Sequence, residues 1–248
     1  MSGHSKWASI KHKKAIVDAK RGKVFTKLIR EISAAARTGG GDPVSNPRLR
    51  TAIQSARIAN MPADNIERAI KKGTGGLEGV SYEEVMYEGY GPQGVAILAQ
   101  CLTDNKNRTA SEIRSIFAKM GGSMAGAGSV AWLFEKKGLM VVSKEHASED
   151  RLMEIVLAKG AEDLTEAGGK FEIITAPHDF EVVRHALEEA KIPMESAQLT
   201  MIPKNQVTAS PESARAVLRL INALEDHDDI QSVYANCDIP DEVMKEIS

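Results

Sequence analysis

The chain has 248 residues, of which 42% are hydrophobic and 4% aromatic, and its formal net charge is −2. This length and apolar content favour two or three packed domains with mainly aliphatic cores. No apolar stretch follows the cations at the N-terminus, and no run approaches the ~18 apolar residues of a membrane span, so the sequence predicts a cytoplasmic protein with no secretory signal and no membrane partner. The two cysteines, Cys101 and Cys237, lie in apolar runs and are expected to be buried in a reducing compartment.

The small net charge conceals two parts of opposite sign. Residues 1–75 contain 16 Lys and Arg against 5 Asp and Glu, a net charge of +11, whereas residues 76–248 carry −13. A cluster of positive charge of this size is typical of proteins that bind polyanions. The first interpretation is therefore a polyanion-binding N-terminal part joined to an acidic remainder.

The first predicted helix runs from about residue 23 to 37 and follows a basic arm of residues 1–21. At about 100° per residue, its cations form one stripe opposite the apolar side chains. The stripe contains Lys20, Lys23, Lys27, Arg30 and Arg37. Such a helix packs on a small core with one face and presents cations to solvent with the other. A merely solvated helix is the alternative, but it would carry balancing acids, and Glu31 is the one acid between Val24 and Gly41.

Two further helices are predicted before the composition changes. Asn46 followed by Pro47 gives an N-cap and a proline at the first helical position. Pro62 opens a third helix, which Gly73 closes. We therefore expect residues 1–75 to form an all-α domain.

From residue 76 the pattern changes to short, β-rich runs separated by helices. Four helix–turn–strand units are predicted, at 109–134, 149–175, 180–202 and 211–237. The middle β-α-β-α-β run resembles the ferredoxin-like arrangement. The expected fold class is α+β: a three-helix N-terminal domain followed by two ferredoxin-like α/β domains, one inserted in the other. In this division, residues 76–135 and 204–248 form one α/β domain and 136–203 form the inserted one. Two consecutive domains are the alternative.

The sequence contains no constellation that indicates catalysis, a nucleotide or a metal. The Gly-rich stretch 121–129 follows a helix and precedes a strand, the reverse of a phosphate-cradling loop, so a tight turn or a partner-contact loop is expected. Six scattered histidines pair with no cysteine at zinc spacing, and no His-Glu-x-x-His or Gly-x-Ser-x-Gly motif occurs. The prediction is no enzyme activity, no cofactor and no metal site. Acidic runs such as 225–229 are interpreted as solvated surface.

A second candidate phosphate site lies in the loop 103–112. Thr109 and Glu112 form a capping box, which predicts a helix that begins at Thr109. Lys106 and Arg108 precede this N-terminus, where free amide groups and the helix dipole favour anions. A purely structural strand-to-helix turn is the alternative. Together, the candidate nucleic-acid-binding residues are Lys6, Lys11, Lys13, Lys14, Lys20, Arg21, Lys23, Lys27, Arg30, Arg37, Arg48, Arg50, Arg57, Lys106 and Arg108.

Several long stretches resemble the YebC (PmpR-like) family, in the same order along the chain. They read GHSKWASIKHKKAIVDAKRGKVFTKLIREI, NPRLRTAI, NMPADNIERAIKKG, YEGYGPQG, DNKNRT and GSVAWLF. The resemblance covers essentially the whole chain and implies a helical domain followed by two α/β domains in a cytoplasmic, DNA-binding transcriptional regulator. Because the family also includes mitochondrial translational activators, and its members have been linked to ribosomes stalled at proline-rich stretches, the resemblance implies nucleic-acid-linked regulation and leaves open whether DNA or RNA is the polymer. Residues 121–125 depart from the family, with GGSMA where GGNLG is common.

We therefore expect a non-enzymatic DNA-binding regulator of transcription that grips phosphates with residues 1–75. The acidic α/β domains would contact other proteins or set geometry, and by lying near the basic helices they could partly screen them. The alternative is a ribosome- or RNA-associated translation factor that uses the same surface, with ribosomal RNA as its partner. The sequence does not separate the two, because phosphate contacts carry no polymer identity.

Overall fold

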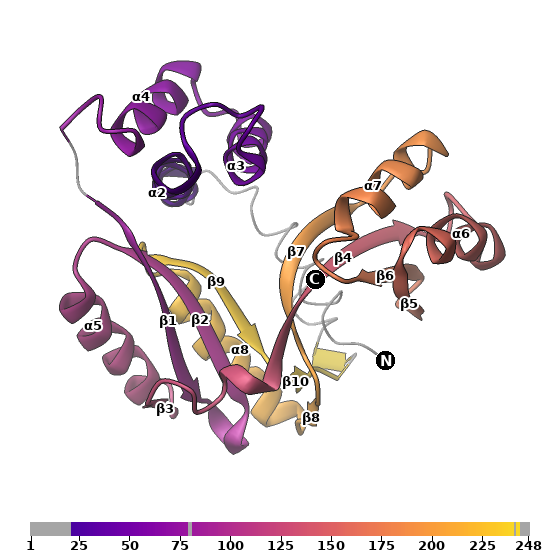
Figure 1. Cartoon of the computed structure of the whole chain (residues 1–248). Helices are drawn as coiled ribbons and strands as arrows, with labels where there is room; N and C mark the ends of the chain where they lie inside the picture. The colour runs from indigo at the N-terminus through magenta and orange to yellow at the C-terminus, as the bar shows by residue number, and fades with distance from the viewer. Residues whose placement is uncertain (1–20, 79–80, 241, 244–248) are drawn as a thin grey trace. The chain divides into compact units, whose positions relative to one another are not determined.

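The computed structural model describes residues 21–78, 81–240 and 242–243, and Figure 1 shows its elements. The described residues form two compact units. One contains residues 21–131 and 215–235, and the other contains residues 132–214 together with those described after 235. Within the described ranges, no helix combines the length and the apolar character that a membrane span requires.

The first unit begins with a helical trio. Its members are α2 (Arg21–Gly39), α3 (Pro47–Ile58) and α4 (Ala63–Gly73). As predicted, Asn46 caps α3, and its side-chain oxygen accepts the amide of Leu49 at 3.1 Å. The same buried side chain donates from Nδ2 to the carbonyls of Ala35 and Gly40, each at 2.8 Å. One residue thus caps the start of α3 and ties it to the end of α2 and to the residue that follows α2.

The trio has a small core in which helix backbones approach closely. Its buried members are Ile32, Ala35, Ala36, Leu49, Ala52, Ile53, Ala56, Met61, Ile66 and Ala69. Small side chains permit this approach: a Cβ added to Gly73 would lie 2.3 Å from the carbonyl oxygen of Ser33. The Ser33 hydroxyl also donates to the carbonyl of Ala69 at 2.9 Å. The end of α4 is therefore fixed against α2.

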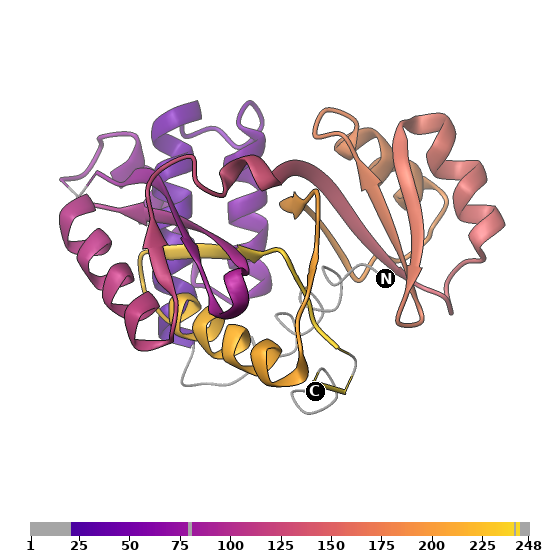
Figure 2. The same ribbon diagram turned by 90° about the horizontal axis from the view of Figure 1, so that it is seen from below.

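The remainder of the first unit is an antiparallel sheet. Its strands are β1 (Glu83–Tyr90), β2 (Ala96–Thr103), β3 (Ser123–Ala125) and β9 (Ile230–Ala235), in the order β3-β1-β2-β9. Helices α5 (Lys106–Lys119) and α8 (Pro211–Glu225) cover one face (Figure 2). On this face, a Cβ added to Gly89 would meet Phe117 of α5, and a Cβ added to Gly91 would meet Leu220 of α8. This is the ferredoxin-like strand order, with the strand usually third along the chain placed first as β1.

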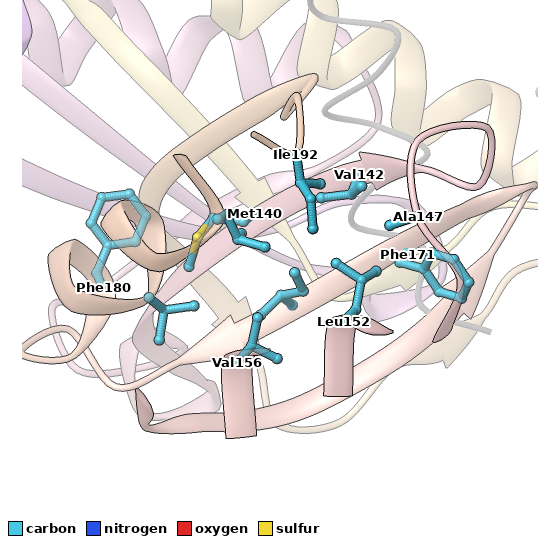
Figure 3. Packing of buried hydrophobic residues seen from close by; sticks show 11 residues of the cluster. Met140, Val142, Ala147, Leu152, Val156, Phe171, Phe180 and Ile192 are labelled. Atoms are coloured by element: carbon cyan, nitrogen blue, oxygen red, sulfur yellow. The ribbon is translucent and has the colours of Figure 1, made fainter. Parts of the chain in front are cut away.

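The second unit contains a complete β-α-β-β-α-β fold. Its elements are β4 (Phe134–Ser143), α6 (Glu149–Val156), β5 (Ala161–Ala167), β6 (Lys170–Thr175), α7 (Phe180–Glu189) and β7 (Ser196–Pro203). The sheet is antiparallel in the order β5-β6-β4-β7, which is again ferredoxin-like. Figure 3 shows the core that both helices form on the sheet, with Leu152 and Val156 from α6 and Phe180 from α7. A short parallel pair, β8 (Val207–Thr208) with β10 (Cys237–Asp238), follows.

The structure confirms the predicted fold class. The second sheet lies, along the sequence, between β3 and the α8–β9 segment of the first sheet. Two strand predictions were wrong: β5 was missed, and the strand expected at 129–134, at the end of the unit 109–134, is a bend with a short 3-10 helix, Ala131–Leu133, after which β4 begins at Phe134. The division into domains 1–75, 76–135 with 204–248, and 136–203 stays a proposal.

Candidate nucleic-acid interface

Three residues of the basic stripe on α2 lie against a turn between α8 and β9. We call Lys23, Lys27 and Arg30 the basic face, and residues 225–229 the acidic turn. Lys23 Nζ donates to the carbonyl of Asp226 at 3.0 Å, and its distance to the Asp226 carboxylate is 3.9 Å. Lys27 Nζ donates to the carbonyl of Glu225 at 2.6 Å.

Arg30 is the most buried member of the basic face. Its guanidinium forms an ion pair with Asp229, and the side chains are 14% and 3% exposed, respectively. The guanidinium also lies over the ring of Tyr82, 5.4 Å from the centroid. The prediction that the stripe faces solvent is therefore wrong at Arg30, because an acidic segment distant in sequence packs on it. The interpretation of 225–229 as solvated surface is wrong at Asp229 for the same reason.

Asp229 joins three separate parts of the chain. Besides Arg30, its carboxylate accepts Arg108 Nη2 at 2.8 Å and the Thr109 hydroxyl at 2.5 Å. Burial by itself raises the pKa of this carboxyl, but the Thr109 hydroxyl and the two guanidinium groups outweigh it and lower the pKa to about 2. Asp229 is therefore ionised at neutral pH and binds Arg30, Arg108 and Thr109 together.

A backbone amide of the acidic turn orients His227 beside Asp229. The amide of Asp229 donates to His227 Nδ1 at 3.1 Å, so Nε2 carries the proton and donates to Glu112 at 2.8 Å. Glu112, His227 and Asp229 offer ligand atoms within 4.8 Å of one another, an arrangement that could hold a metal ion. A cation there would compete with the two guanidinium groups that already neutralise Asp229.

The start of α5 differs from its prediction. The helix begins at Lys106, with Asn105 as N-cap accepting the amide of Arg108 at 3.1 Å. Thr109 is fully buried, and its hydroxyl bonds Thr103 and Asp229 instead of capping a helix. The capping-box prediction failed because Asn105, four residues earlier, is an equally good cap.

The two cations of this loop are paired with acids. Lys106 contacts Glu83 at 2.5 Å, and Arg108 contacts Asp104 at 2.8 Å in addition to Asp229. The structure therefore places acidic partners where the sequence suggested a phosphate. Binding of nucleic acid by Lys106 and Arg108 stays a prediction.

Two cations of α3 also have partners within the chain. Arg48 bridges Glu31 of α2, at 2.7 Å, and Glu84 of β1, at 3.1 Å, and these two carboxylates raise its pKa. Arg50 is exposed, and its Nη1 donates to the carbonyls of Pro43 and Val44 at 3.0 and 3.1 Å. Arg48 thus adds a second ionic link between the trio and the sheet.

Four exposed cations of the trio differ from these. The side-chain cations of Arg37, Arg57, Lys71 and Lys72 form no hydrogen bond or ion pair with any residue that the structure describes. Lys71 and Lys72 lie at the end of α4, whose Gly73 faces Ser33 and Ala36 of α2. Arg37 follows Ala36 directly, so three of the four cations lie at one corner of the trio. Of these, the candidate set named Arg37 and Arg57 and omitted Lys71 and Lys72.

Part of the candidate set lies outside the described residues. These residues are Lys6, Lys11, Lys13, Lys14 and Lys20. For Arg21, the structure describes the helical backbone alone. Their contribution to an interface therefore remains as the sequence predicted it.

A different carboxylate organises the Gly-rich loop. Glu88 of β1 is 5% exposed and accepts the amides of Gly128, Val130 and Ala131 at 2.7, 2.6 and 2.8 Å. Burial raises its pKa, but these amides prevail and lower it. The loop amides are thus bound to an internal carboxylate, which agrees with the predicted structural turn. The partner of this turn, Glu88, was not among the residues singled out by the sequence.

Comparison with known proteins places this arrangement in a family. Residues 5–76 match the model for the TACO1/YebC protein N-terminal domain, and residues 82–237 match the TACO1/YebC second and third domain. A relative from Desulforapulum autotrophicum, named a probable transcriptional regulatory protein, is 61% identical over 98% of both chains. One of the same name from Geobacter sulfurreducens is 56% identical over 100% of both.

A solved structure is similar over most of the chain. The crystal structure of a conserved hypothetical protein from Aquifex aeolicus has a TM-score of 0.80 and 50% sequence identity, and the match covers 90% of this chain and 92% of that one. Together with the two family models, which span nearly the whole chain, this agreement confirms the resemblance read from the motifs. The chain belongs to the TACO1/YebC family.

Proposed function

We propose that this protein is a DNA-binding, non-enzymatic regulator of transcription that contacts phosphates through the exposed cations of its helical trio. The names of its relatives support a regulatory role. The observation that carries the proposal is the corner formed by Arg37, Lys71 and Lys72, cations with no acidic partner among the described residues. Such cations bind phosphates at the lowest cost, because no internal ion pair has to be broken first.

The same corner supplies a rigid support for these charges. The backbone of α4 touches α2 at Gly73, and Gly41 faces the side chains of Ile70 and Thr74. Lysine and arginine side chains on a fixed helical scaffold can follow a phosphate backbone without reading its sequence. We expect sequence-independent binding from this corner, to which residues 1–21 and Arg57 add further positive charge.

The test is a salt titration of affinity with the full chain. One variant carries Arg37→Gln, Lys71→Gln and Lys72→Gln, and the matched control carries Lys136→Gln, Lys159→Gln and Lys204→Gln, three exposed lysines of the second unit. A labelled 20-base-pair duplex reports binding by fluorescence anisotropy. Each phosphate contact contributes about −0.9 to the slope of log K against log salt, so the first variant should flatten the slope by about 2.7.

The control should keep the slope of the wild type and lose little affinity. Equal losses in both triple variants would show that general charge, and not this corner, determines binding. A structured RNA hairpin provides the comparison between polymers at matched salt. If the hairpin binds more tightly than the duplex, the proposal of a DNA regulator is wrong and the RNA-associated translation factor replaces it.

A further inference from the structure

The basic face of α2 contacts oxygen acceptors within the chain that resemble the phosphate oxygens of a nucleic-acid backbone. Lys23 and Lys27 point at carbonyl oxygens of the acidic turn, and Arg30 points at the Asp229 carboxylate. These are oxygen acceptors in the positions that phosphate oxygens would take on a basic helix. The acidic turn thus provides an internal substitute for a polyanion.

We propose that the acidic turn is an intramolecular competitor: in the free protein it covers the basic face, and nucleic-acid phosphates displace it to bind Lys23, Lys27 and Arg30. This inference rests on the proposed function, since it concerns how the same helical trio is regulated. It adds a second set of phosphate contacts, which forms only after the trio has moved away from the acidic turn.

In the closed state, in which the acidic turn covers the basic face, the contacts between them differ in exposure: the Arg30–Asp229 ion pair is well buried, whereas the Lys23–Asp226 pair is about half exposed. The Lys23 and Asp226 side chains are 48% and 58% exposed, and pairs of this kind are strongly screened by solvent and salt. Lys27 Nζ donates to the carbonyl of Glu225 at 2.6 Å. Arg30 is well buried, but its Nε has no acceptor among the described residues, and an unsatisfied buried donor lowers the net gain of the pair.

If the trio moved away from the acidic turn and from β1, charged side chains on both sides would keep other hydrogen-bond partners. When Arg30 departs, Asp229 keeps Arg108 and the Thr109 hydroxyl. When the trio separates from β1, Arg48 keeps Glu31 while Glu84 keeps Gln100 at 2.7 Å. Because neither side is left with a buried, unpaired charge, the usual penalty for breaking a buried ion pair is much reduced.

Hydrogen exchange of the unmodified full chain tests the displacement directly. Amide exchange across residues 222–230 is measured with and without a saturating 20-base-pair duplex, with saturation checked by anisotropy. Displacement predicts faster exchange in this segment on binding, because the acidic turn loses its cover. Unchanged or slower exchange would mean that the contact is a permanent joint, and the proposal would be wrong.

Variants provide an independent test through coupling. Asp229→Asn weakens the anchor of the closed state, and Asp163→Asn, at an exposed position in the second unit, makes the same change of charge. Asp229→Asn should bind the duplex more tightly than Asp163→Asn. Replacing both Lys23 and Lys27 by Gln should reduce affinity little in the wild type and about threefold more in the Asp229→Asn background, a coupling typical of interacting sites.

The outcomes separate this inference from the proposed function. If the duplex binds but the substitutions are additive, the competition is refuted and the proposed function stands. If no variant binds duplex or hairpin, both are refuted. If Asp229→Asn does not fold, as judged by circular dichroism, the exchange measurement on the unmodified chain decides, and Asp226→Asn, at an exposed position, replaces it in the coupling test with a smaller effect of the same sign.

Discussion

Asp229 is a single carboxylate on which α2, the start of α5 and the α8–β9 turn converge. Its donors come from residues 30, 108 and 109, and its own amide is bound by His227. Burying a carboxylate is unfavourable unless charged donors compensate it, and two arginines and a hydroxyl do so here. The stability of this part of the first unit should therefore depend on the ionisation of one residue.

The pH dependence of stability follows from the lowered pKa of Asp229, about 2 in the folded protein. Because the folded value is below the ordinary one, the stabilisation is complete above about pH 4 and is lost as the pH falls toward 2. We expect Asp229→Asn to reduce the free energy of unfolding by about 1.5–3 kcal/mol at pH 7. Urea denaturation at pH 7, 4 and 2.5 should show this difference shrinking, and Asp163→Asn should show none at any pH.

A second prediction at the scale of single residues concerns Glu88. Glu88→Gln removes the charge that three loop amides share, and the amide group of the new side chain cannot accept all of them. We expect a loss of about 1.5–3 kcal/mol and faster hydrogen exchange at residues 128–131, with little change in α6 or α7. The matched control is Glu154→Gln, an exposed position on α6. Unchanged exchange at 128–131 would show that the loop is fixed by other contacts.

At the scale of elements, the trio depends on close contact between α2 and α4. Gly73→Ala would place a Cβ 2.3 Å from a backbone oxygen of Ser33, which cannot rotate away as a side chain would. Forced repacking of this kind costs about 1–3 kcal/mol. Thermal unfolding should show the loss, whereas Gly22→Ala, with nothing within 4 Å of its new Cβ, should be neutral or stabilising by up to about 1 kcal/mol. A Gly73→Ala variant as stable as Gly22→Ala would contradict the packing described.

Local signals predicted most elements, and their failures have physical reasons. Asn46 and Pro47 mark the start of α3 because capping depends on neighbours in sequence. The strand β5 was missed because AEDLTEA is polar, and it pairs with β6 alone at the edge of its sheet, where polar side chains are tolerated. The start of α5 was misplaced because Asn105 and Thr109 compete as caps and tertiary contacts of Thr109 decide.

For the whole molecule, the sequence showed that positive and negative charges are segregated along the chain, but it did not show which charged residues contact each other. Composition showed a basic trio and an acidic remainder, and it even suggested that one could screen the other. It could not show that Arg30 meets Asp229, because those residues are 199 positions apart. Periodicity separates the apolar and polar faces of a helix, but it cannot tell a cation that faces solvent from one that faces an acidic partner.

The ionic links between trio and sheet should respond differently to salt. Lys23 and Asp226 are about half exposed, so screening at high ionic strength should abolish an interaction that is worth at most about 1 kcal/mol. Arg30 and Asp229 are largely shielded from ions, and their coupling should persist. Double-mutant cycles with Lys23→Gln and Asp226→Asn, and with Arg30→Gln and Asp229→Asn, measure both couplings from urea denaturation at 0.05 and 1 M NaCl. Because the Arg30–Asp229 pair is far less exposed than the Lys23–Asp226 pair, high salt should loosen the closed state without opening it. If the second coupling vanished along with the first, the Arg30–Asp229 pair would be as solvent-accessible as the surface pair, and the expectation that the closed state survives high salt would be wrong.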